Sequence, residues 1–239
     1  MAYGVNAPFG LKPSRFLSGA TWNDQTNQYI LNTDSNLSIF TNDPVVATAG
    51  GGITSAVYQD PTVAVTAGTL LIGSFQGCQY IDPNGFLVDS PSWITGTVIK
   101  AGTKVTAFVT DDPNIIYDIQ CSSFGNGVVA ANVQLGLAAE DIFQNAGFAA
   151  GGTFTANPPP NNAAVPTGVG YNGGQSVVFL ALNTKNTTST LPLKIIGLTP
   201  QIQNVFYPNG TTGVAVGNFN NASVIINTHN YKSVGTTGV

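Results

Sequence analysis

The chain has 239 residues, a formal net charge of −4 and only 8% charged residues, against 43% hydrophobic ones. This hydrophobic content excludes wholesale disorder, which accompanies low hydrophobicity and high net charge. The acidic balance and the seven Lys and Arg residues argue against a nucleic-acid partner, whose phosphates need basic side chains, and against an electrostatic membrane anchor.

The first 20 residues are predicted to form an extended N-terminal arm. Pro8 and Pro13 disfavour a regular helix, yet the arm carries several large apolar side chains. Such side chains need cover that water does not give, so they lie either on the chain's own sheet or on a neighbouring molecule. Both alternatives stay open. For the second, the candidate contact residues are Phe9, Leu11, Arg15, Phe16 and Leu17.

The body of the chain alternates short β-branched and aromatic runs with turn residues, which is typical of an all-β sandwich or jelly roll. Turn formers such as Asp82-Pro83-Asn84-Gly85 separate the runs, because Pro presets φ and Asn or Gly tolerates positive φ. In residues 104–110 two unlike faces alternate, which predicts a strand with one face in the core: Val105, Ala107 and Val109 on one face, and Thr106, Phe108 and Thr110 on the other. The predicted strands are residues 29–31, 37–40, 45–47, 69–79, 94–99, 104–110, 115–119, 176–182, 191–198, 214–216 and 223–227.

Two segments differ from this pattern. Residues 128–146 are Ala-rich and predict a short helical segment, although Gly136 in the middle disfavours a long one. Residues 144–175 contain Pro158-Pro159-Pro160 and several Gly pairs, and predict an exposed Pro/Gly-rich insertion. We therefore expect one sandwich or jelly-roll-like domain over residues 1–239, with the arm at 1–20 and the insertion at 144–175.

Few residues suit catalysis or metal binding. His229 is the only histidine and Glu140 the only glutamate, and no ligand set has metal-site spacing. Asp111, Asp112 and Asp118 are the best catalytic or Ca²⁺ candidates. A calcium loop, however, spaces its oxygen ligands at alternate positions and has a Gly in its turn, whereas this segment has Pro113, so a turn with capping carboxylates is favoured. We expect no enzyme activity, no cofactor and no metal.

Cysteines and aromatic residues leave two further alternatives. Cys78 and Cys121 are expected to be buried free thiols, since nothing indicates an oxidising compartment. Trp22 and Trp93 would form a sugar-stacking platform if exposed and coplanar, but core or interface packing is favoured. Neither a secretory signal nor an apolar run long enough for a bilayer is seen, so we expect synthesis in a cytoplasm.

A series of motifs resembles the small virion structural proteins of tailed bacteriophages that act as head cement or decoration proteins. The series covers about half of the chain and consists of structural rather than catalytic signatures. It comprises Ala-Pro-Phe-Gly-Leu-Lys-Pro-Ser-Arg-Phe-Leu-Ser-Gly at 7–19, Asn-Asp-Pro-Val-Val at 42–46, Ile-Thr-Gly-Thr-Val at 94–98, Thr-Asp-Asp-Pro-Asn at 110–114, Tyr-Asp-Ile-Gln at 117–120, Leu-Lys-Ile-Ile-Gly-Leu at 193–198 and Val-Ile-Ile-Asn-Thr-His at 224–229.

The resemblance implies a β-rich protein, typically a homotrimer, that binds between major capsid protein subunits on the outer face of the virion and brings no catalytic residue. Residues 144–190 look longer than the family would predict. The alternatives are a carbohydrate-binding tail or fibre module, favoured by exposed coplanar Trp side chains, and a β-fold hydrolase, favoured by Asp residues that converge in a cleft.

Overall fold

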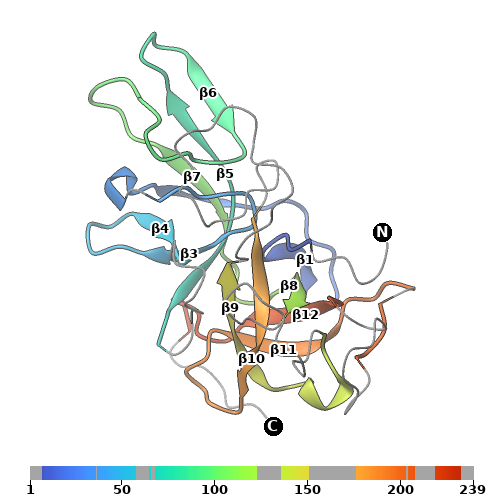
Figure 1. Ribbon diagram of the computed structural model, residues 1–239. Coiled ribbons are helices and arrows are strands. Elements are labelled where there is room, and N and C mark those ends of the chain that lie inside the picture. The colour runs from blue at the N-terminus through green and yellow to red at the C-terminus, as the bar shows by residue number, and fades with distance from the viewer. Residues whose placement is uncertain are drawn as a thin grey trace.

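The computed structural model describes residues 7–35, 37–57, 65, 68–122, 136–150, 176–202, 204–207 and 219–232. Its regular structure is nearly all β, in two six-stranded sheets (Figure 1). Two single turns of 3-10 helix, η1 (Thr33–Ser35) and η2 (Ala139–Asp141), are the helical elements of these residues. The all-β class expected from the sequence is confirmed.

The first sheet closes on itself. It contains β1 (Lys12–Phe16), β8 (Ile115–Ser122), β9 (Asn145–Ala150), β10 (Val178–Asn186), β11 (Leu193–Leu198) and β12 (Asn221–Ile226). Strands pair in the order β8-β10-β9-β11-β12, and β12 pairs with β8 again, so these five form a barrel. The β8–β10 pair is parallel and the others are antiparallel. Closure leaves few free strand edges, which protects a β protein from edge-to-edge association.

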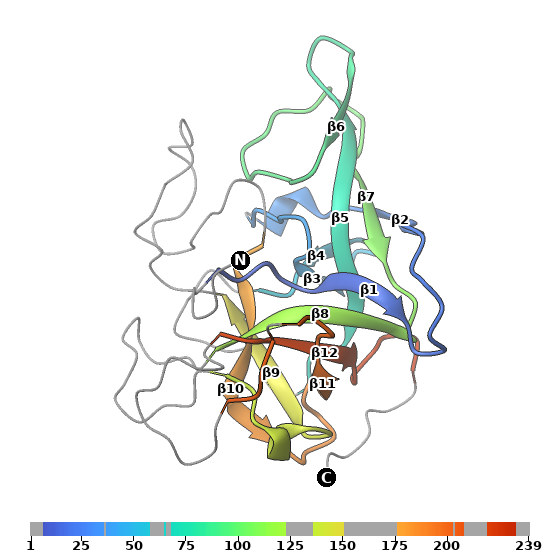
Figure 2. The same cartoon turned by 90° about the vertical axis from the view of Figure 1, so that its right-hand side faces the viewer.

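Strand β1 extends this sheet outside the ring. It pairs antiparallel with the first half of β8, whose last residues pair with β10 instead. Figure 2 shows β1 running along β8 at the side of the barrel. The N-terminal arm is therefore built into the chain's own sheet over residues 12–16.

The second sheet is organised around one long strand, β5 (Leu71–Ile81). One edge of β5 pairs with β7 (Thr106–Thr110), which in turn pairs with β2 (Asn27–Ile30). Along its other edge, β5 pairs with β3 (Pro44–Ala47) near its start and with β6 (Leu87–Ser90) near its end. Strand β3 also pairs with β4 (Ile53–Ser55). All these pairs are antiparallel. At about 3.4 Å per residue, the 11 residues of β5 span roughly 35 Å. Figure 2 shows β5 running from the barrel to the far end of the open sheet.

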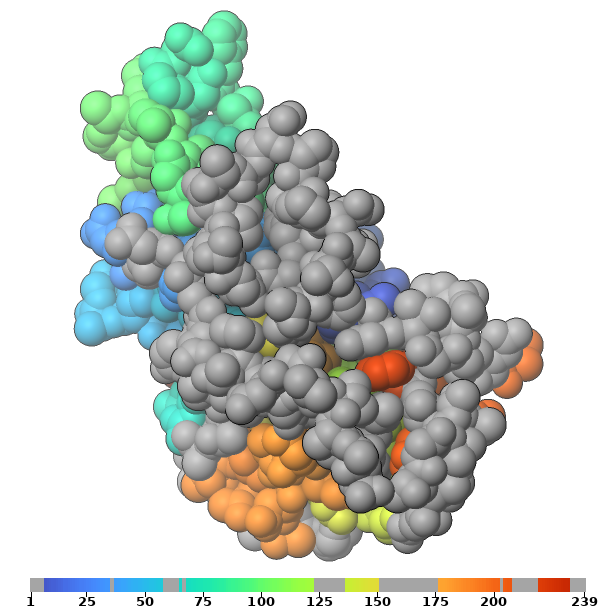
Figure 3. Space-filling model, viewed as in Figure 1, coloured from blue at the N-terminus to red at the C-terminus, as the bar shows by residue number. Residues whose placement is uncertain are grey.

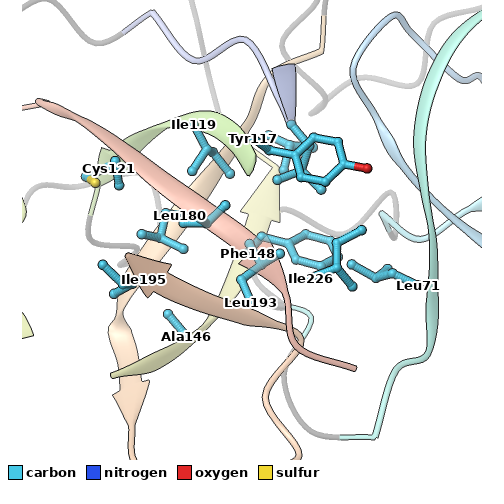
Figure 4. Packing of buried hydrophobic residues seen from close by; sticks show 14 of the residues in the cluster. Leu71, Tyr117, Ile119, Cys121, Ala146, Phe148, Leu180, Leu193, Ile195 and Ile226 are labelled. Carbon is cyan, nitrogen blue, oxygen red and sulfur yellow. The ribbon is translucent and has the colours of Figure 1, made fainter. Parts of the chain in front are cut away.

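Each sheet has its own hydrophobic core. The barrel core is lined by alternate residues of the closed strands, and Leu71 at the start of β5 reaches into it (Figure 4). Its largest fully buried side chains include Tyr117, Phe148 and Leu180. The second core lies on the open sheet around Phe75, Trp93 and Val109.

A junction of backbone hydrogen bonds connects the two sheets, and we define it by residues 10–11, 41–43, 74–75 and 176–178. Gly10 N donates to Val178 O at 3.0 Å, and Leu11 N donates to Asn42 O at 2.8 Å. The Ser74 hydroxyl donates to Leu11 O at 2.6 Å. Val178 belongs to β10 of the barrel, Ser74 belongs to β5 of the open sheet, and Asn42 lies in the turn before β3, where its N–H donates to Phe75 O. Two consecutive residues of the arm therefore bridge both sheets.

Several strand predictions are confirmed, among them residues 29–31, 45–47, 69–79, 104–110, 115–119, 176–182, 191–198 and 223–227, which overlap observed strands. In residues 104–110, Val105, Ala107 and Val109 are buried as the alternation predicted. Residues 37–40 form only a single bridge, between Ile39 and Trp93, and residues 94–99 form no strand. Residues 214–216 lie outside the described part of the chain.

Two expectations about residues 128–175 need correction. Over the described residues 136–146 the expected helix is a single 3-10 turn at 139–141, and residues 128–135 lie outside the description. Residues 145–150 are strand β9, buried along its whole length inside the barrel sheet, so they are not part of an exposed insertion. The sequence pattern did not indicate this strand because its residues are mostly small. Gly147 has to be small, since a Cβ there would lie 2.4 Å from the carbonyl oxygen of Val65. Residues 151–175 lie outside the description.

We predict that a single methyl group added at Gly10 strongly destabilises the junction. Gly10 has φ +79°, and a Cβ there would lie 2.3 Å from Asn42 O and 2.5 Å from Ser176 Cβ. We expect Gly10→Ala to lower the free energy of unfolding by about 2–4 kcal/mol, measured by urea denaturation. Gly19→Ala is the matched control, because φ there is +90° but no atom lies within 4 Å. The control is expected to cost only about 1 kcal/mol. Equal losses would contradict a packed junction.

The junction also contains a buried carboxyl group, Asp43, which is 5% exposed. Burial raises the pKa of Asp43 from 3.8 to about 7, although hydrogen bonds from the Ser176 hydroxyl and the Phe40 N–H act in the opposite direction. The Phe40 bond is 2.8 Å long. Among the described residues no cationic side chain pairs with Asp43. The folded state therefore favours the protonated carboxyl.

The raised pKa of Asp43 predicts that the folded protein becomes less stable as pH rises. Because the folded pKa of Asp43 lies above the unfolded value of 3.8, its stabilising effect is full below about pH 4 and is lost as pH rises to about 7. We expect this group to lower the free energy of unfolding by up to about 4 kcal/mol over that range. Asp43→Asn removes the titration, so wild type minus variant isolates it in thermal melts from pH 4 to 8. Parallel pH profiles of the two proteins would contradict the assignment.

Candidate functional site

The five contact residues predicted in the arm have different environments. Leu11 is 0% exposed and belongs to the barrel core, so its side chain packs inside its own chain and is not available to a neighbour. Phe16 is half-buried and packs against the same core. Phe9 and Arg15 are also half-buried, and only Leu17 is largely exposed, at 55%. Burial thus corrects the contact hypothesis for Leu11 and leaves Leu17 as its most accessible member.

The location of β1 changes what a truncation tests. Residues 12–16 supply a strand that pairs with β8, and Leu11 fills part of the barrel core. Removal of residues 2–17 would therefore take away structural parts of the barrel together with any contact surface. Point substitutions at exposed positions are the cleaner tests of binding.

The carboxylate of Asp111 connects β2 directly, and the segment after β12 through Tyr29, to the end of β7. Asn27 Nδ2 donates to both of its oxygens, at 2.8 and 3.0 Å, and the Tyr29 hydroxyl donates to Oδ2. The Tyr29 and Tyr231 hydroxyl oxygens lie 2.6 Å apart. Burial and the Asp111 hydrogen bond raise the pKa of Tyr29, so this phenol stays protonated. Asp111 therefore fastens edge strand β2 and the segment after β12 to the end of β7.

The other two carboxylates of the candidate cluster have separate partners. Asp112 Oδ1 accepts the N–H of Asn114 at 2.7 Å, the capping role favoured for this turn. Asp118 Oδ1 accepts the hydroxyls of Thr199 and Ser223, each at 3.0 Å. In the part of the chain that the structure describes, no three His, Cys, Asp or Glu side chains gather as a metal site would require. In these contacts the Asp side chains accept hydrogen bonds that connect strands or cap a turn.

The remaining reactive side chains are enclosed. His229 is 0% exposed, and its Nδ1 accepts the N–H of Tyr231 at 3.1 Å. Burial lowers the pKa of His229, which favours the neutral ring. Cys78 and Cys121 are buried free cysteines, as expected, and burial raises the pKa of the Cys78 thiol to about 11. None of these groups is presented to solvent as a nucleophile or base.

The tryptophans do not form a binding platform. Trp93 is buried, and its ring meets that of Tyr80 edge-on, with centroids 5.7 Å apart at 86°. Trp22 is half-buried and packs against the barrel core. The exposed, coplanar arrangement that would favour sugar stacking is therefore not present for this pair. Trp93 instead anchors the loop after β6, because its backbone exchanges two 2.8 Å hydrogen bonds with Ile39.

The surface feature that sequence reasoning missed is a projecting end of the open sheet. We call residues 81–104 the finger: the turn after β5, strand β6 and the loop that leads to β7. Figure 1 shows the finger standing clear of the barrel, and Figure 3 shows it as the teal and green end of the molecule. Its most exposed large apolar side chains are Phe86 at 69%, Leu87 at 64% and Val98 at 70%, and these define the finger tip.

The turn that presents Phe86 is held rigidly. Asp82 N donates to Phe86 O at 2.9 Å, and Gly85 N donates to Asp82 O at 3.0 Å. Phe86 N donates to Asp82 Oδ1 at 2.8 Å, and this bond lowers the pKa of Asp82. The sequence identified the Asp82-Pro83-Asn84-Gly85 turn, but the exposure of Phe86 and Leu87 depends on the tertiary structure, in which no described segment covers them.

Other exposed apolar side chains are scattered or lie beside residues outside the description. Ile202, Val205 and Phe206 belong to the second kind, since the positions around them are only partly described. The described residues contain no helix long and apolar enough to cross a membrane. Comparison with family models, with curated proteins and with solved structures gave no match to this chain.

The Asp111 contacts lead to a stability prediction. We expect Asp111→Ala to lower the free energy of unfolding by about 1–3 kcal/mol, because Asn27 and Tyr29 lose their shared acceptor. The control Asp112→Ala removes one capping bond at the edge of a turn and is expected to cost about 1 kcal/mol or less. Chemical denaturation measures both. If Asp111→Ala kept full stability but abolished a hydrolytic activity of the wild type, Asp111 would be catalytic instead.

Proposed function

We propose that this protein is a cement or decoration protein of a tailed-bacteriophage head, which stabilises the shell by non-covalent binding between major capsid protein subunits. The observation that carries the proposal is the finger, a stiff projection whose tip is apolar and exposed. Exposed apolar groups on a soluble protein commonly mark a surface for another protein. The motif series that resembles phage decoration proteins supplies the identity of that partner.

The side-chain chemistry supports a structural role over an enzymatic one. Asp111, Asp112 and Asp118 each bind local backbone or side-chain donors, and His229 is enclosed. Catalysis needs titratable groups that converge on a substrate, and in the described residues these groups diverge. The proposal therefore includes no catalytic activity, no cofactor and no metal.

The proposal also covers assembly and location. Closed symmetric oligomers are the common form of self-association, and the family resemblance selects a homotrimer on the outer face of the virion. A sandwich or jelly-roll-like arrangement of the complete chain belongs to the same proposal. Low charge suits such a surface, because contacts that do not depend on ion pairs are little affected by salt. Many identical copies on one shell add their binding through multivalency.

The alternatives receive less support. A carbohydrate-binding module was favoured by exposed, coplanar tryptophans, and Trp93 is buried. A β-fold hydrolase was favoured by convergent Asp residues, and the three candidates have separate partners. No contact of the described residues favours either alternative over the decoration role.

Binding to empty heads tests the proposal. The protein is mixed with shells assembled from the major capsid protein of the same genome, and the mixture is sedimented and imaged by electron microscopy. We expect saturable, stoichiometric binding at micromolar concentration or below, added density on the outer face, and a higher temperature of shell disruption. Bovine serum albumin is the control for nonspecific pelleting. Failure to bind at tens of micromolar would contradict the proposed function.

A further inference from the structure

The finger tip offers more than a generic apolar surface, because its support is rigid on both sides. Strand β6 pairs with β5 over Ile81 to Cys78, and Lys100 N donates to Ile81 O at 2.9 Å from the other side. At its base, Trp93 packs edge-on against Tyr80 of β5. A side chain that is already fixed before binding loses little conformational entropy on docking, which is how interface anchors gain affinity.

The size of the tip decides what kind of partner it fits. Phe86, Leu87 and Val98 together expose on the order of 300–400 Å² of apolar surface. A stable dimer needs roughly 800 Å² from each partner, so the tip alone is too small to hold two copies of this chain face to face. A narrow convex projection buries its surface fully only in a depression of another molecule.

Charge at the tip gives a second constraint. The titratable side chains of the finger are Asp82, Asp89, Lys100 and Lys104, two of each sign. The finger therefore has no net charge to match against a strongly acidic or basic surface. Its partner is recognised by apolar complementarity, and binding of this kind changes little with ionic strength.

We propose that the finger tip docks into an apolar depression on the major capsid protein, with Phe86 as the central anchor. This inference rests on the proposed function and adds to it the contacting residues and the chemistry of the receiving site. The barrel, about 35 Å away along β5, then faces away from that contact. The contribution of one tip is modest, and repetition over the shell supplies the total binding strength.

Phe86→Ser tests the anchor, since Phe86 is exposed and its backbone hydrogen bonds do not need the ring. We expect at least a tenfold weaker affinity for empty heads with unchanged thermal stability of the free protein. Leu70→Ser is the matched control: Leu70 is 54% exposed and adjoins the opposite end of β5. The control is expected to bind like the wild type. Asp82→Ala keeps the ring but removes the acceptor of the Phe86 N–H, and is expected to weaken binding less than Phe86→Ser.

Photo-cross-linking identifies what lies against the tip. With p-benzoylphenylalanine in place of Phe86, irradiation on the shell is expected to join the protein to the major capsid protein, equally at 0.05 and 0.5 M NaCl. Joining to a sister copy, or recruitment of the free protein to phosphatidylcholine vesicles through Phe86, would overturn the inference. Wild-type affinity of Phe86→Ser would overturn it while the proposed function stands. Absence of wild-type binding would overturn both.

Discussion

Two consecutive backbone N–H groups, of Gly10 and Leu11, attach the N-terminal segment to Val178 of the barrel and to Asn42, in the turn that leads into the open sheet. The carbonyl of Leu11 then accepts the Ser74 hydroxyl from β5. This packing leaves no room for a Cβ at Gly10, and the positive φ of that residue turns the chain from one sheet toward the other. The relative placement of barrel and open sheet depends on this junction, and with it the direction in which the finger projects.

Strand β5 connects the junction and the barrel to the finger. Its first residue contributes to the barrel core and is bracketed by hydrogen bonds to Thr228 and from Asn230. Its last residues form the base of the finger, where β6 and the loop around Lys100 support both edges. Partners along both edges of this one strand hold the finger relative to the barrel, although a register shift between Phe75 and Gly77 interrupts the pairing with β7. A projection fixed in this way is suited to docking into a rigid shell.

Polar side chains also connect elements of the fold. Asp111 joins β2, β7 and the segment after β12, and Asp141 accepts Lys185 in an ion pair of 2.5 Å with its own carboxylate fully buried. Asp43 is the exception, since it is buried at the junction without a cationic partner and its pKa is raised to about 7. Its ionisation therefore makes the junction less stable as pH rises from about 4 to about 7.

The amino-acid sequence by itself determined the β class, most strands, the turn at residues 82–85, the free buried thiols and the scarcity of catalytic groups. Each of these depends on local pattern or composition, such as the alternation in residues 104–110. The sequence did not reveal β1, β4, β6 or β9. For β1 and β9 the reason is that the prolines of the arm and the small residues of 145–150 do not have the apolar alternation of a strand. Partners distant in the chain, β8 and β10, make them strands.

Only the tertiary structure decided which apolar side chains are covered. Leu11 and Phe86 look equally apolar in sequence, yet Leu11 enters the barrel core and Phe86 stays in solvent. The physical reason is that burial is set by which segments meet in space, and among the described residues no second layer covers the hairpin that projects from the open sheet. The candidate contact surface therefore moved from the arm to the finger once the packing was known.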